Sequence, residues 1–332
     1  MNKTSIQKIA ADLEVSTTTI SFIINGKADK YKISKATQKR VRDYIEKNNY
    51  QPSSLARSLT TGKSYTIGFL APDIANPFYG QVGKHIEKRL FQAGYQVFLS
   101  STEEDPEMEL KMAQSMVQRQ VDGIILAPAS RRTLTFLRKS GTPTVTFDRK
   151  LPRSKVNFVG IDNYQASFGA INEFLSKNKC RNMLMISITP EVDTLKQRIA
   201  GCIDAFENQG LKYPKHLNLT VDYQNLEQSC YEEISRVLEQ NHSIDSVYFT
   251  NNLTAFRGFY TFSKYHRSRL EKLKLISFDD LPFNEISHPV ITGIEQPKEE
   301  IANSCSRLML SLLNEKKDQV KKIILPVQVN WR

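Results

Sequence analysis

Hydroxyl-bearing side chains are concentrated in the short segment Ser16-Thr-Thr-Thr-Ile-Ser21. A serine or threonine hydroxyl both donates and accepts hydrogen bonds, so it can bond to a phosphate oxygen or read several base edges weakly. Ser16 is also a favourable helix N-cap. The isoleucines that follow at helical spacing are Ile20, Ile23 and Ile24. This pattern predicts a helix that buries its isoleucines and presents hydroxyls from its first turn.

Two further short helices are predicted within residues 1–50. Apolar residues recur at spacings of three and four between Ile6 and Leu13, which defines the buried face of a first helix. A third helix is expected to start at Ser34 and to end near Asn48. Two short helices joined by a tight turn over residues 6–25 are typical of the helix-turn-helix motif, whose second helix lies in the major groove of DNA. The side chains that would face bases or a phosphate are Ser16, Thr17, Thr18 and Ser21.

The positive charge of the chain lies mostly near its N-terminus. The net charge is +11, and residues 1–63 contribute +7 of it, with 12 Lys and Arg against 5 Asp and Glu. A cationic face on a small helical domain attracts a phosphate backbone, because binding releases condensed counterions. The alternative is an ordinary solvated lysine surface.

Residues that could perform catalysis or bind a metal show no suitable spacing. The four cysteines form no C-x-x-C pair, and neither a G-x-S-x-G motif nor a phosphate-binding glycine loop is present. We therefore expect no catalytic residue, no metal and no cofactor, and we expect the cysteines to be reduced and mostly buried. The histidines and cysteines in question are His85, His216, His242, His266, His288, Cys180, Cys202, Cys230 and Cys305.

From Tyr65 onward, short apolar segments alternate with amphipathic ones. Strands are predicted at 67–71, 96–100, 123–127, 144–147, 183–187, 246–250, 274–278 and 323–329, and helices at 77–92, 106–119 and 164–177. This rhythm predicts an α/β fold of two doubly wound halves, each a parallel sheet covered on both faces. Such sheets bind ligands beyond the carboxyl ends of their strands, so two facing halves would form a cleft.

Several motifs along essentially the whole chain resemble those of the LacI/GalR family of bacterial repressors. They are Val15-Ser-Thr-Thr-Thr-Ile-Ser21 with Asn25-Gly26, Leu55-Ala-Arg-Ser-Leu59, Asn76-Pro-Phe-Tyr79, Val121-Asp-Gly-Ile-Ile125 and Ser277-Phe-Asp-Asp280. The segments Asn25-Gly-Lys-Ala-Asp-Lys-Tyr-Lys-Ile-Ser34, Gln118-Arg-Gln-Val-Asp122 and Phe147-Asp-Arg149 are similar to the fructose-repressor (catabolite repressor/activator) subgroup.

The resemblance implies three parts with separate roles. These are a helix-turn-helix DNA-binding domain at residues 1–50, a hinge helix and linker at 51–63, and an effector-binding and dimerisation body at 64–332. The body would be two-lobed and similar to periplasmic binding proteins. The implied function is that of a sequence-specific transcriptional regulator, a repressor whose operator binding is controlled by a sugar or sugar phosphate. The alternative is a cytoplasmic sugar-binding protein without a regulatory role.

The resemblance also adds contacts to DNA. In the family the hinge forms a helix in the minor groove, where a leucine wedges between base steps, and Leu59 occupies the matching position. Residues 53–61 are too few for a stable isolated helix, so we expect order there only on DNA. The alternative is an ordinary linker with an incidental leucine. The residues added to the DNA contacts are Phe22, Asn25, Leu55, Arg57 and Leu59.

Two residues of the head depart from the common family pattern. Phe22 stands where many members have arginine, and we expect it at the surface in apolar contact with thymine rather than in the core. Glu14 stands in the turn where the family commonly has glycine. A positive φ at that residue would cost about 1 kcal/mol.

Carried over residue by residue, the resemblance places an effector cleft at the strand ends. Asp and Asn suit vicinal hydroxyls, Tyr offers a flat face to a sugar ring, and Arg forks onto carboxylate or phosphate. Arg149, Lys196 and Arg198 together would favour a sugar phosphate, with fructose 1-phosphate the ligand implied by the subgroup, unless Lys196 points to solvent. The aspartates at 162 and 279 have helix capping as an alternative. The expected effector residues are Asp73, Phe78, Asp148, Arg149, Asp162, Arg198, Tyr223, Asn251 and Asp279.

The remaining expectations concern partners and location. The partners implied are a palindromic double-stranded DNA operator, the carbohydrate effector and a second copy of the chain in a homodimer. The first twenty residues contain no continuous apolar stretch, so no signal peptide is expected, and no window approaches the ~18 apolar residues of a membrane span. A cytoplasmic location is expected, whereas a periplasmic sugar-binding protein would carry a signal peptide and lack the basic head.

Overall fold

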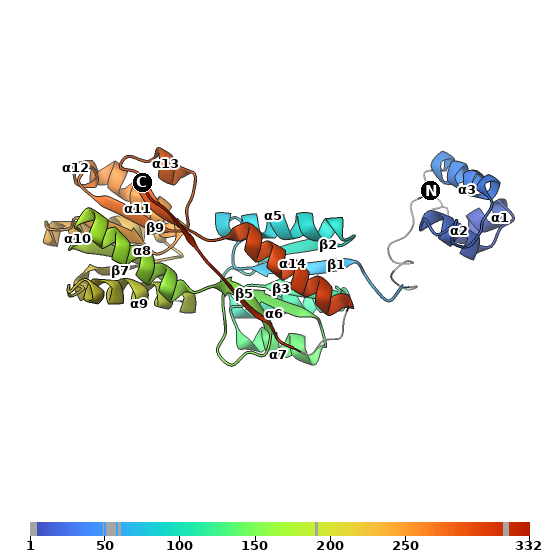
Figure 1. The fold of residues 1–332 in the computed structure, drawn as a ribbon, viewed down its shortest axis with the longest axis horizontal. Helices are drawn as coiled ribbons and strands as arrows, with labels where there is room; N and C mark the ends of the chain where they lie inside the picture. The colour runs from blue at the N-terminus through green and yellow to red at the C-terminus, as the bar shows by residue number, and fades with distance from the viewer. Residues whose placement is uncertain (1–4, 49, 51–57, 59–60, 190–191, 315–318) are drawn as a thin grey trace. The chain divides into compact units, whose positions relative to one another are not determined.

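The computed structural model of the protein describes residues 5–48, 50, 58, 61–189, 192–314 and 319–332 (Figure 1). These residues divide into two compact units, residues 1–64 and residues 65–332. We call the first the head and the second the body, and we describe each by itself.

The head contains the three predicted helices, α1 (Ile6–Asp12), α2 (Thr17–Ile24) and α3 (Lys35–Lys47). Each begins after a serine whose side chain accepts a hydrogen bond from a backbone amide of the first turn. Such caps satisfy donors that the helix itself leaves unpaired. The buried core of the head is formed by Ile9, Ala10, Ile20, Ile23, Ala28 and Val41.

The turn between α1 and α2 contains the predicted departure at Glu14. This residue has φ 51°, in the left-handed region that glycine adopts without strain. The head therefore retains a local backbone cost of about 1 kcal/mol at this position.

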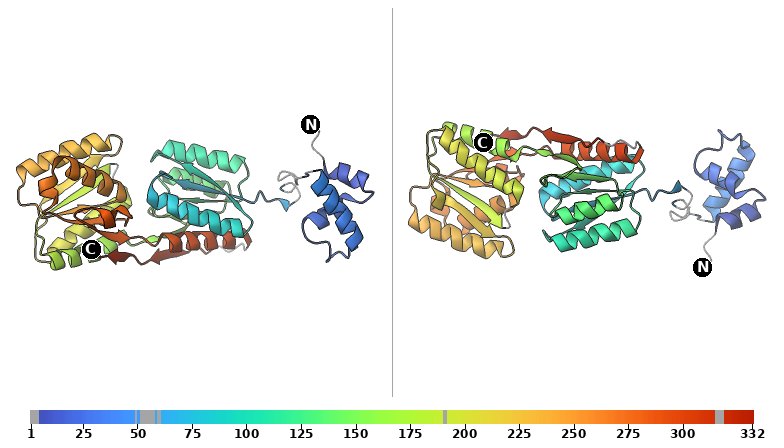
Figure 2. Two further views of the ribbon diagram at one scale, coloured as in Figure 1. Left: turned by 90° about the horizontal axis from the view of Figure 1, so that it is seen from above. Right: turned by 90° about the horizontal axis from the view of Figure 1, so that it is seen from below.

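The body begins with a six-stranded parallel sheet in the order β11-β5-β4-β3-β1-β2. Helices α5 and α14 cover one face, and α6 and α7 cover the other (Figures 1 and 2). We call this the first lobe. Its elements are β1 (Thr66–Ala71), α5 (Pro77–Gln92), β2 (Gln96–Ser101), α6 (Pro106–Gln118), β3 (Gly123–Leu126), α7 (Arg131–Lys139), β4 (Thr144–Phe147), β5 (Asn157–Ile161), α14 (Lys298–Asn314) and β11 (Lys322–Leu325).

The second lobe holds another six-stranded sheet, in the order β12-β10-β9-β8-β6-β7, whose edge strand β12 is antiparallel. Helices α8 and α9 pack together, as do α10 and α11. Its elements are α8 (Asn163–Asn178), β6 (Met183–Thr189), α9 (Asp193–Asn208), the 3-10 turn Lys215–Leu217, β7 (Asn218–Asp222), α10 (Leu226–Gln240), β8 (Ser246–Phe249), α11 (Asn252–Tyr265), α12 (Arg267–Leu270), β9 (Lys274–Phe278), α13 (Phe283–Ile286), β10 (Ile291–Glu295) and β12 (Gln328–Asn330). The prediction of an α/β fold with two doubly wound halves is confirmed.

The chain passes between the lobes three times, after β5, after β10 and after β11. The last passage corrects the prediction of one strand over residues 323–329, because β11 belongs to the first sheet and β12 to the second. Pro326 lies between them. Proline has no amide hydrogen to donate to a neighbouring strand, so it favours a break at this point.

None of the helices in the described ranges is long and apolar enough to span a membrane. All four cysteines are free and buried. Burial raises the pKa of the Cys180 thiol to about 11 and that of Cys230 to about 12, so both stay protonated near neutral pH.

Candidate functional site

A cavity between the two lobes contains about 640 Å³ of empty space, open solvent included. Its walls come from segments that follow the carboxyl ends of strands, such as Asp73 after β1, Asp148 after β4 and Asp279 after β9. This is the place where open α/β sheets bind ligands, because the loops there converge from several strands. We call this cavity the cleft.

The predicted effector residues line the cleft with one exception. Asp162 is exposed, and its carboxylate accepts a hydrogen bond from the amide of Gln165 at 2.9 Å, which caps the N-terminus of α8. The prediction of Asp162 as an effector contact is therefore corrected in favour of its capping alternative. The predicted residues that line the cleft are Asp73, Phe78, Asp148, Arg149, Arg198, Tyr223, Asn251 and Asp279.

Arg198 is buried in the second lobe, where α9 supplies it to the cleft. Its Nε donates to the Asn163 side chain at 2.8 Å, and Nη1 donates to the Thr250 carbonyl at 2.9 Å. The guanidinium carbon lies 3.6 Å from the ring centroid of Phe278. Two hydrogen bonds and a stacked ring hold the guanidinium plane in one orientation, as a recognition group requires.

Asp148 is a buried carboxyl group of the first lobe that lines the same cleft as Arg198. The Tyr79 hydroxyl donates to its Oδ2 at 2.7 Å. Burial raises the pKa of Asp148, while Arg149, Arg198 and Tyr79 act in the opposite direction. Its φ of 60° is another left-handed backbone position, so the loop after β4 is held in a costly conformation that directs this side chain into the cleft.

Arg149 pairs with Glu104, a residue that the sequence argument did not select. The two terminal nitrogens of Arg149 donate to the two carboxylate oxygens of Glu104 at 2.6 and 2.5 Å. Arg149 is buried, its Nε lies 3.7 Å from the Asp148 carboxylate, and Nε has no hydrogen-bond partner among the described residues. The two terminal nitrogens of Arg149, which could otherwise bind an anionic ligand, are therefore already bonded to the Glu104 carboxylate.

The predicted group of three cations does not form in the structure. Lys196 is exposed and does not line the cleft, whereas Arg149 and Arg198 do. Lysine keeps its strongly hydrated ammonium in water unless it is paired, which explains its position on the outer face of α9.

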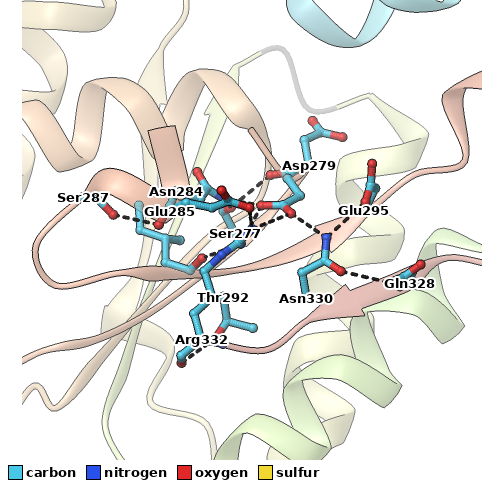
Figure 3. Close-up of polar contacts among 12 residues, drawn as sticks. Ser277, Asp279, Asn284, Glu285, Ser287, Thr292, Glu295, Gln328, Asn330 and Arg332 are labelled. Carbon is cyan, nitrogen blue, oxygen red and sulfur yellow. Dashed lines mark hydrogen bonds and ion pairs between the residues drawn. The ribbon is translucent and has the colours of Figure 1, made fainter. Parts of the chain in front are cut away.

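Asp279 is the second buried carboxylate of the cleft that holds a left-handed backbone conformation, with φ 69°. The Gln296 side chain donates to its Oδ1 at 2.7 Å, and the amide of Asn252 at the start of α11 donates to its Oδ2 at 3.3 Å. Behind it, the Ser277 hydroxyl donates to the Asp279 carbonyl at 3.0 Å, and the Asn284 side chain donates to that hydroxyl at 3.0 Å (Figure 3).

The two lobes are joined across the cleft by a pair of amides. Asn252 Nδ2 donates to Asn76 Oδ1 at 2.8 Å, and Asn76 Nδ2 lies 3.2 Å from Asn252 Oδ1. A carboxylate could only accept, so asparagine is the residue type that allows this reciprocal pair.

We expect Asp148→Asn to weaken the binding of a hydroxyl-bearing ligand by roughly tenfold or more, because a neutral amide loses charge-assisted bonds to ligand hydroxyls. The same change should raise the stability of the body at pH 7. The folded-state pKa of Asp148 is raised by burial, so its carboxylate costs stability once the pH exceeds that pKa, and the cost vanishes below the unfolded pKa of about 3.9.

Thermal melts of the wild type and Asp148→Asn from pH 7 down to pH 4 measure this effect. The advantage of the variant should shrink as the pH falls. Asparagine tolerates the left-handed backbone at this position, so the comparison is not confounded by new strain. A constant difference between the two melting temperatures across this range would contradict the assignment.

A separate network anchors the C-terminal strand behind Asp279. Arg332 pairs through its two terminal nitrogens with the Asp280 carboxylate at 2.7 and 3.0 Å and with Glu285 at 3.0 Å. The Asn330 side chain donates to Asp280 at 2.6 Å. It also donates to Glu295 at 3.0 Å (Figure 3). These bonds attach β12, and with it the last passage between the lobes, to the loop that carries Asp279.

Removing this anchor should lower the free energy of unfolding of the body. Arg332→Ala leaves the largely buried Asp280 carboxylate without its main partner, at a cost of about 2 kcal/mol. Arg267→Ala, which breaks an exposed pair with Glu271, should change stability by less than about 0.5 kcal/mol. Urea unfolding monitored by Trp331 fluorescence measures both, and equal midpoints for the two variants would refute the anchor.

The head presents the polar residues predicted to meet DNA. Ser16, Thr17 and Thr18 are exposed at the start of α2, and Asn25 is exposed at its end. Ser16 Oγ accepts from the amide of Thr19 at 3.0 Å, so this serine caps the helix. Ser21 is half-buried, and Asn25 Nδ2 donates to its carbonyl at 2.8 Å.

Phe22 is half-buried at the surface of the head and does not belong to its core cluster. Its ring stacks on Tyr31, with the centroids 3.7 Å apart and the planes 1° from parallel. Tyr31 lies in the link between α2 and α3 and is itself half exposed. The core alternative for Phe22 is therefore excluded, and the link supports its ring at the surface.

Part of the predicted hinge lies outside the described residues. Leu55, Arg57 and Leu59 belong to that part, so their contacts with DNA stay predictions. Ser58 and Thr61 are described and are helical, and the Gly62 amide donates to the Ser58 carbonyl at 2.8 Å.

Within the described ranges, no group of three His, Cys, Asp or Glu side chains is placed to hold a metal ion. The cleft instead combines carboxylates, amides, two guanidinium groups and the rings of Phe78 and Tyr223. Such a set recognises a hydroxyl-rich ligand through directional hydrogen bonds and a flat apolar face.

Sequence comparison matches two families along the chain. Residues 5–53 match the family described as bacterial regulatory proteins, lacI family, and residues 67–317 match the periplasmic binding protein domain. The fructose operon regulatory protein of Vibrio cholerae is 27% identical over 99% of both chains. The catabolite repressor/activator of Salmonella typhimurium is 26% identical over 93% of this chain and 92% of its own.

Structure comparison supports the same fold. The Cra transcriptional dual regulator from Pseudomonas putida, solved in complex with fructose 1-phosphate, has a TM-score of 0.71 at 21% identity and covers 81% of this chain and 98% of its own. All three of these relatives are named as regulators or repressors. The chain belongs to the LacI family of transcriptional regulators, which carry a helix-turn-helix DNA-binding domain and a periplasmic-binding-protein-like body, and within it resembles the fructose-type regulators.

Proposed function

We propose that the protein is a cytoplasmic homodimeric repressor that binds a palindromic operator and changes its affinity for that operator when a sugar or sugar phosphate occupies the cleft. The observation that carries this proposal is the composition of the cleft. Buried Asp148 and Asp279 follow strands of different lobes, and buried Arg198 comes from helix α9. All three line the cleft, together with an aromatic face. A ligand that bonds to both lobes at once stabilises one relative position of the lobes over another.

The dimer proposal is supported by exposed apolar side chains on the body. Phe91 at the end of α5 and Phe98 and Leu99 on the edge strand β2 are all exposed. In the second lobe Phe256 and Tyr260 are exposed on α11. Large exposed apolar side chains and unpaired sheet edges are surfaces that proteins usually cover, and a second copy of the body would cover them.

The proposed coupling acts through the hinge. Two hinge helices must pack side by side to enter one minor groove, so the separation of the two first lobes decides whether they form. An effector shifts that equilibrium only by its differential affinity for the two arrangements. Hydrogen exchange should show protection at residues 53–61 on operator binding, and equal exchange with and without operator would exclude this route.

Selection of genomic fragments by the purified full-length chain tests the proposal. Fragments enriched at physiological ionic strength should share a two-fold symmetric site, and analytical ultracentrifugation should give one dimer per site. Thr17→Ala and Thr18→Ala together should reduce binding to the enriched fragment more than to scrambled duplex, because they remove base contacts and no phosphate charge. Equal affinity of the wild type for enriched and scrambled duplex would contradict the proposal. It would favour the alternative, a sugar-binding protein without a regulatory role.

A further inference from the structure

The ionisable side chains of the cleft carry an excess of negative charge. Among the residues that the structure describes, four carboxylates and two guanidinium groups line it, and neither lysine nor histidine does. Even if one of the buried carboxyls is protonated, the balance stays negative. A phosphate group brings up to two further negative charges, which this lining would repel at short range and low dielectric. The charged residues of the lining are Asp73, Glu104, Asp148, Arg149, Arg198 and Asp279.

Neither guanidinium group offers a free fork. Both terminal nitrogens of Arg149 are bonded to Glu104, in the bidentate geometry that an incoming phosphate would need. Arg198 uses Nε and Nη1 within the protein, and its Nη2 makes no hydrogen bond to the described residues. A single remaining nitrogen suits a ligand hydroxyl or ring oxygen better than a bidentate anion.

The helix N-termini at the cleft are also largely satisfied by the protein. Asn76 Oδ1 accepts from the amide of Phe78 at the start of α5, and Asn251 Oδ1 accepts from the amide of Thr254 at the start of α11. A phosphate bound at a helix start relies on such amides being free. The first turn of α9, which has no side-chain cap, carries the carboxylate of Asp193.

Glu104 is held in place at a cost. It has φ 57° and follows Glu103 at φ 51°, so two consecutive residues with side chains occupy the left-handed region. Such conformations cost about 1 kcal/mol each and persist where the surroundings determine them. This backbone directs Glu104 to Arg149, whereas Glu103 is exposed and does not line the cleft.

We infer that the effector is an uncharged, polyhydroxylated sugar and that Glu104 is the residue that excludes its phosphorylated counterparts. The inference rests on the proposed function, in which the cleft binds a carbohydrate. Glu104 excludes a phosphate because its carboxylate already bonds to both terminal nitrogens of Arg149. The hydrogen-bonding groups of Asp148, Asp279 and Asn251 remain suited to neutral hydroxyls.

Calorimetry on the full-length chain tests this with inorganic phosphate and with two matched pairs, fructose against fructose 1-phosphate and ribose against ribose 5-phosphate. The wild type should bind inorganic phosphate and both phosphorylated sugars at least about tenfold more weakly than Glu104→Gln does, because the variant removes the competing carboxylate from Arg149. Glu103→Gln removes the same charge from the neighbouring exposed position and should behave as the wild type. Thermal melts establish that both variants are folded.

Two results would overturn the inference. One is a wild type that binds either phosphorylated sugar more tightly than its neutral partner. The other is a folded Glu104→Gln variant with no gain in affinity for inorganic phosphate or for the phosphorylated sugars. Operator binding is measured on the same preparations, so a failure of the regulatory function shows itself as loss of DNA preference and is distinct from a wrong ligand charge.

Discussion

Replacing Arg198 by methionine is expected to lower the affinity for the effector by roughly 10- to 100-fold. The variant keeps an unbranched apolar stem against Phe278 but loses the guanidinium, and hydrogen bonds to a charged group contribute about 1.5–3 kcal/mol each. The substitution also removes one of the two guanidinium groups of the cleft, so the net charge of its lining becomes more negative. Calorimetry with the tightest-binding sugar measures the change.

Lys196 provides the matched control for this prediction. It lies on the same helix two residues earlier and carries the same charge, but it is exposed and does not line the cleft. Lys196→Met should therefore bind the sugar as the wild type does. Equal losses in the two variants would indicate a general effect of charge on α9, and no loss in Arg198→Met would contradict the assignment of the cleft.

Replacing Leu59 by alanine is expected to lower operator affinity by roughly a hundredfold while leaving sugar affinity unchanged. Inserting a leucine between base steps costs free energy because the bases unstack. The bent DNA then contacts more of the protein surface, and these contacts offset that cost. Alanine is too short to fill that wedge, so the kinked complex loses its apolar contact. Fluorescence anisotropy with a labelled operator fragment measures the affinity at fixed salt, which matters because phosphate contacts are strongly salt-dependent.

Thr61→Ala is the control for the hinge, since it alters a neighbouring residue without removing an apolar wedge. It should bind operator within about threefold of the wild type, as expected for an exposed substitution. The account of the hinge fails if Leu59→Ala binds operator as tightly as Thr61→Ala. It also fails if Leu59→Ala loses affinity equally for operator and scrambled duplex.

Much of the architecture could be predicted because local chemistry specifies it. Serines at the starts of the three head helices are strong caps, and the structure places each helix directly after them. In the body, the predicted helix over 77–92 and the strands over 144–147 and 274–278 have the bounds that the structure shows. The resemblance to the family predicted Asp73, Asp148 and Asp279 as residues of one cleft, and all three line one cavity of the structure, where each follows the carboxyl end of a strand.

The parts that escaped prediction depend on contacts between distant segments. Pro326 divides the last apolar segment into two strands of different sheets. Only the tertiary fold shows that β11 pairs with β5 and that β12 pairs with β10. Glu104 also follows a strand, yet its pairing with Arg149 across 45 residues leaves no mark in either local sequence. Asp162 shows the opposite error, because a capping aspartate and a ligand-binding one look alike in sequence.

The most direct test of the proposed regulation is the affinity of the effector measured with and without operator. If occupancy of the cleft and binding of DNA are coupled, operator must change the sugar dissociation constant by the same factor by which sugar changes the operator dissociation constant, because the coupling free energy is reciprocal. We predict a factor of roughly 5 to 150 in both directions for the wild type. Identical sugar affinity in the free and operator-bound protein would contradict the account.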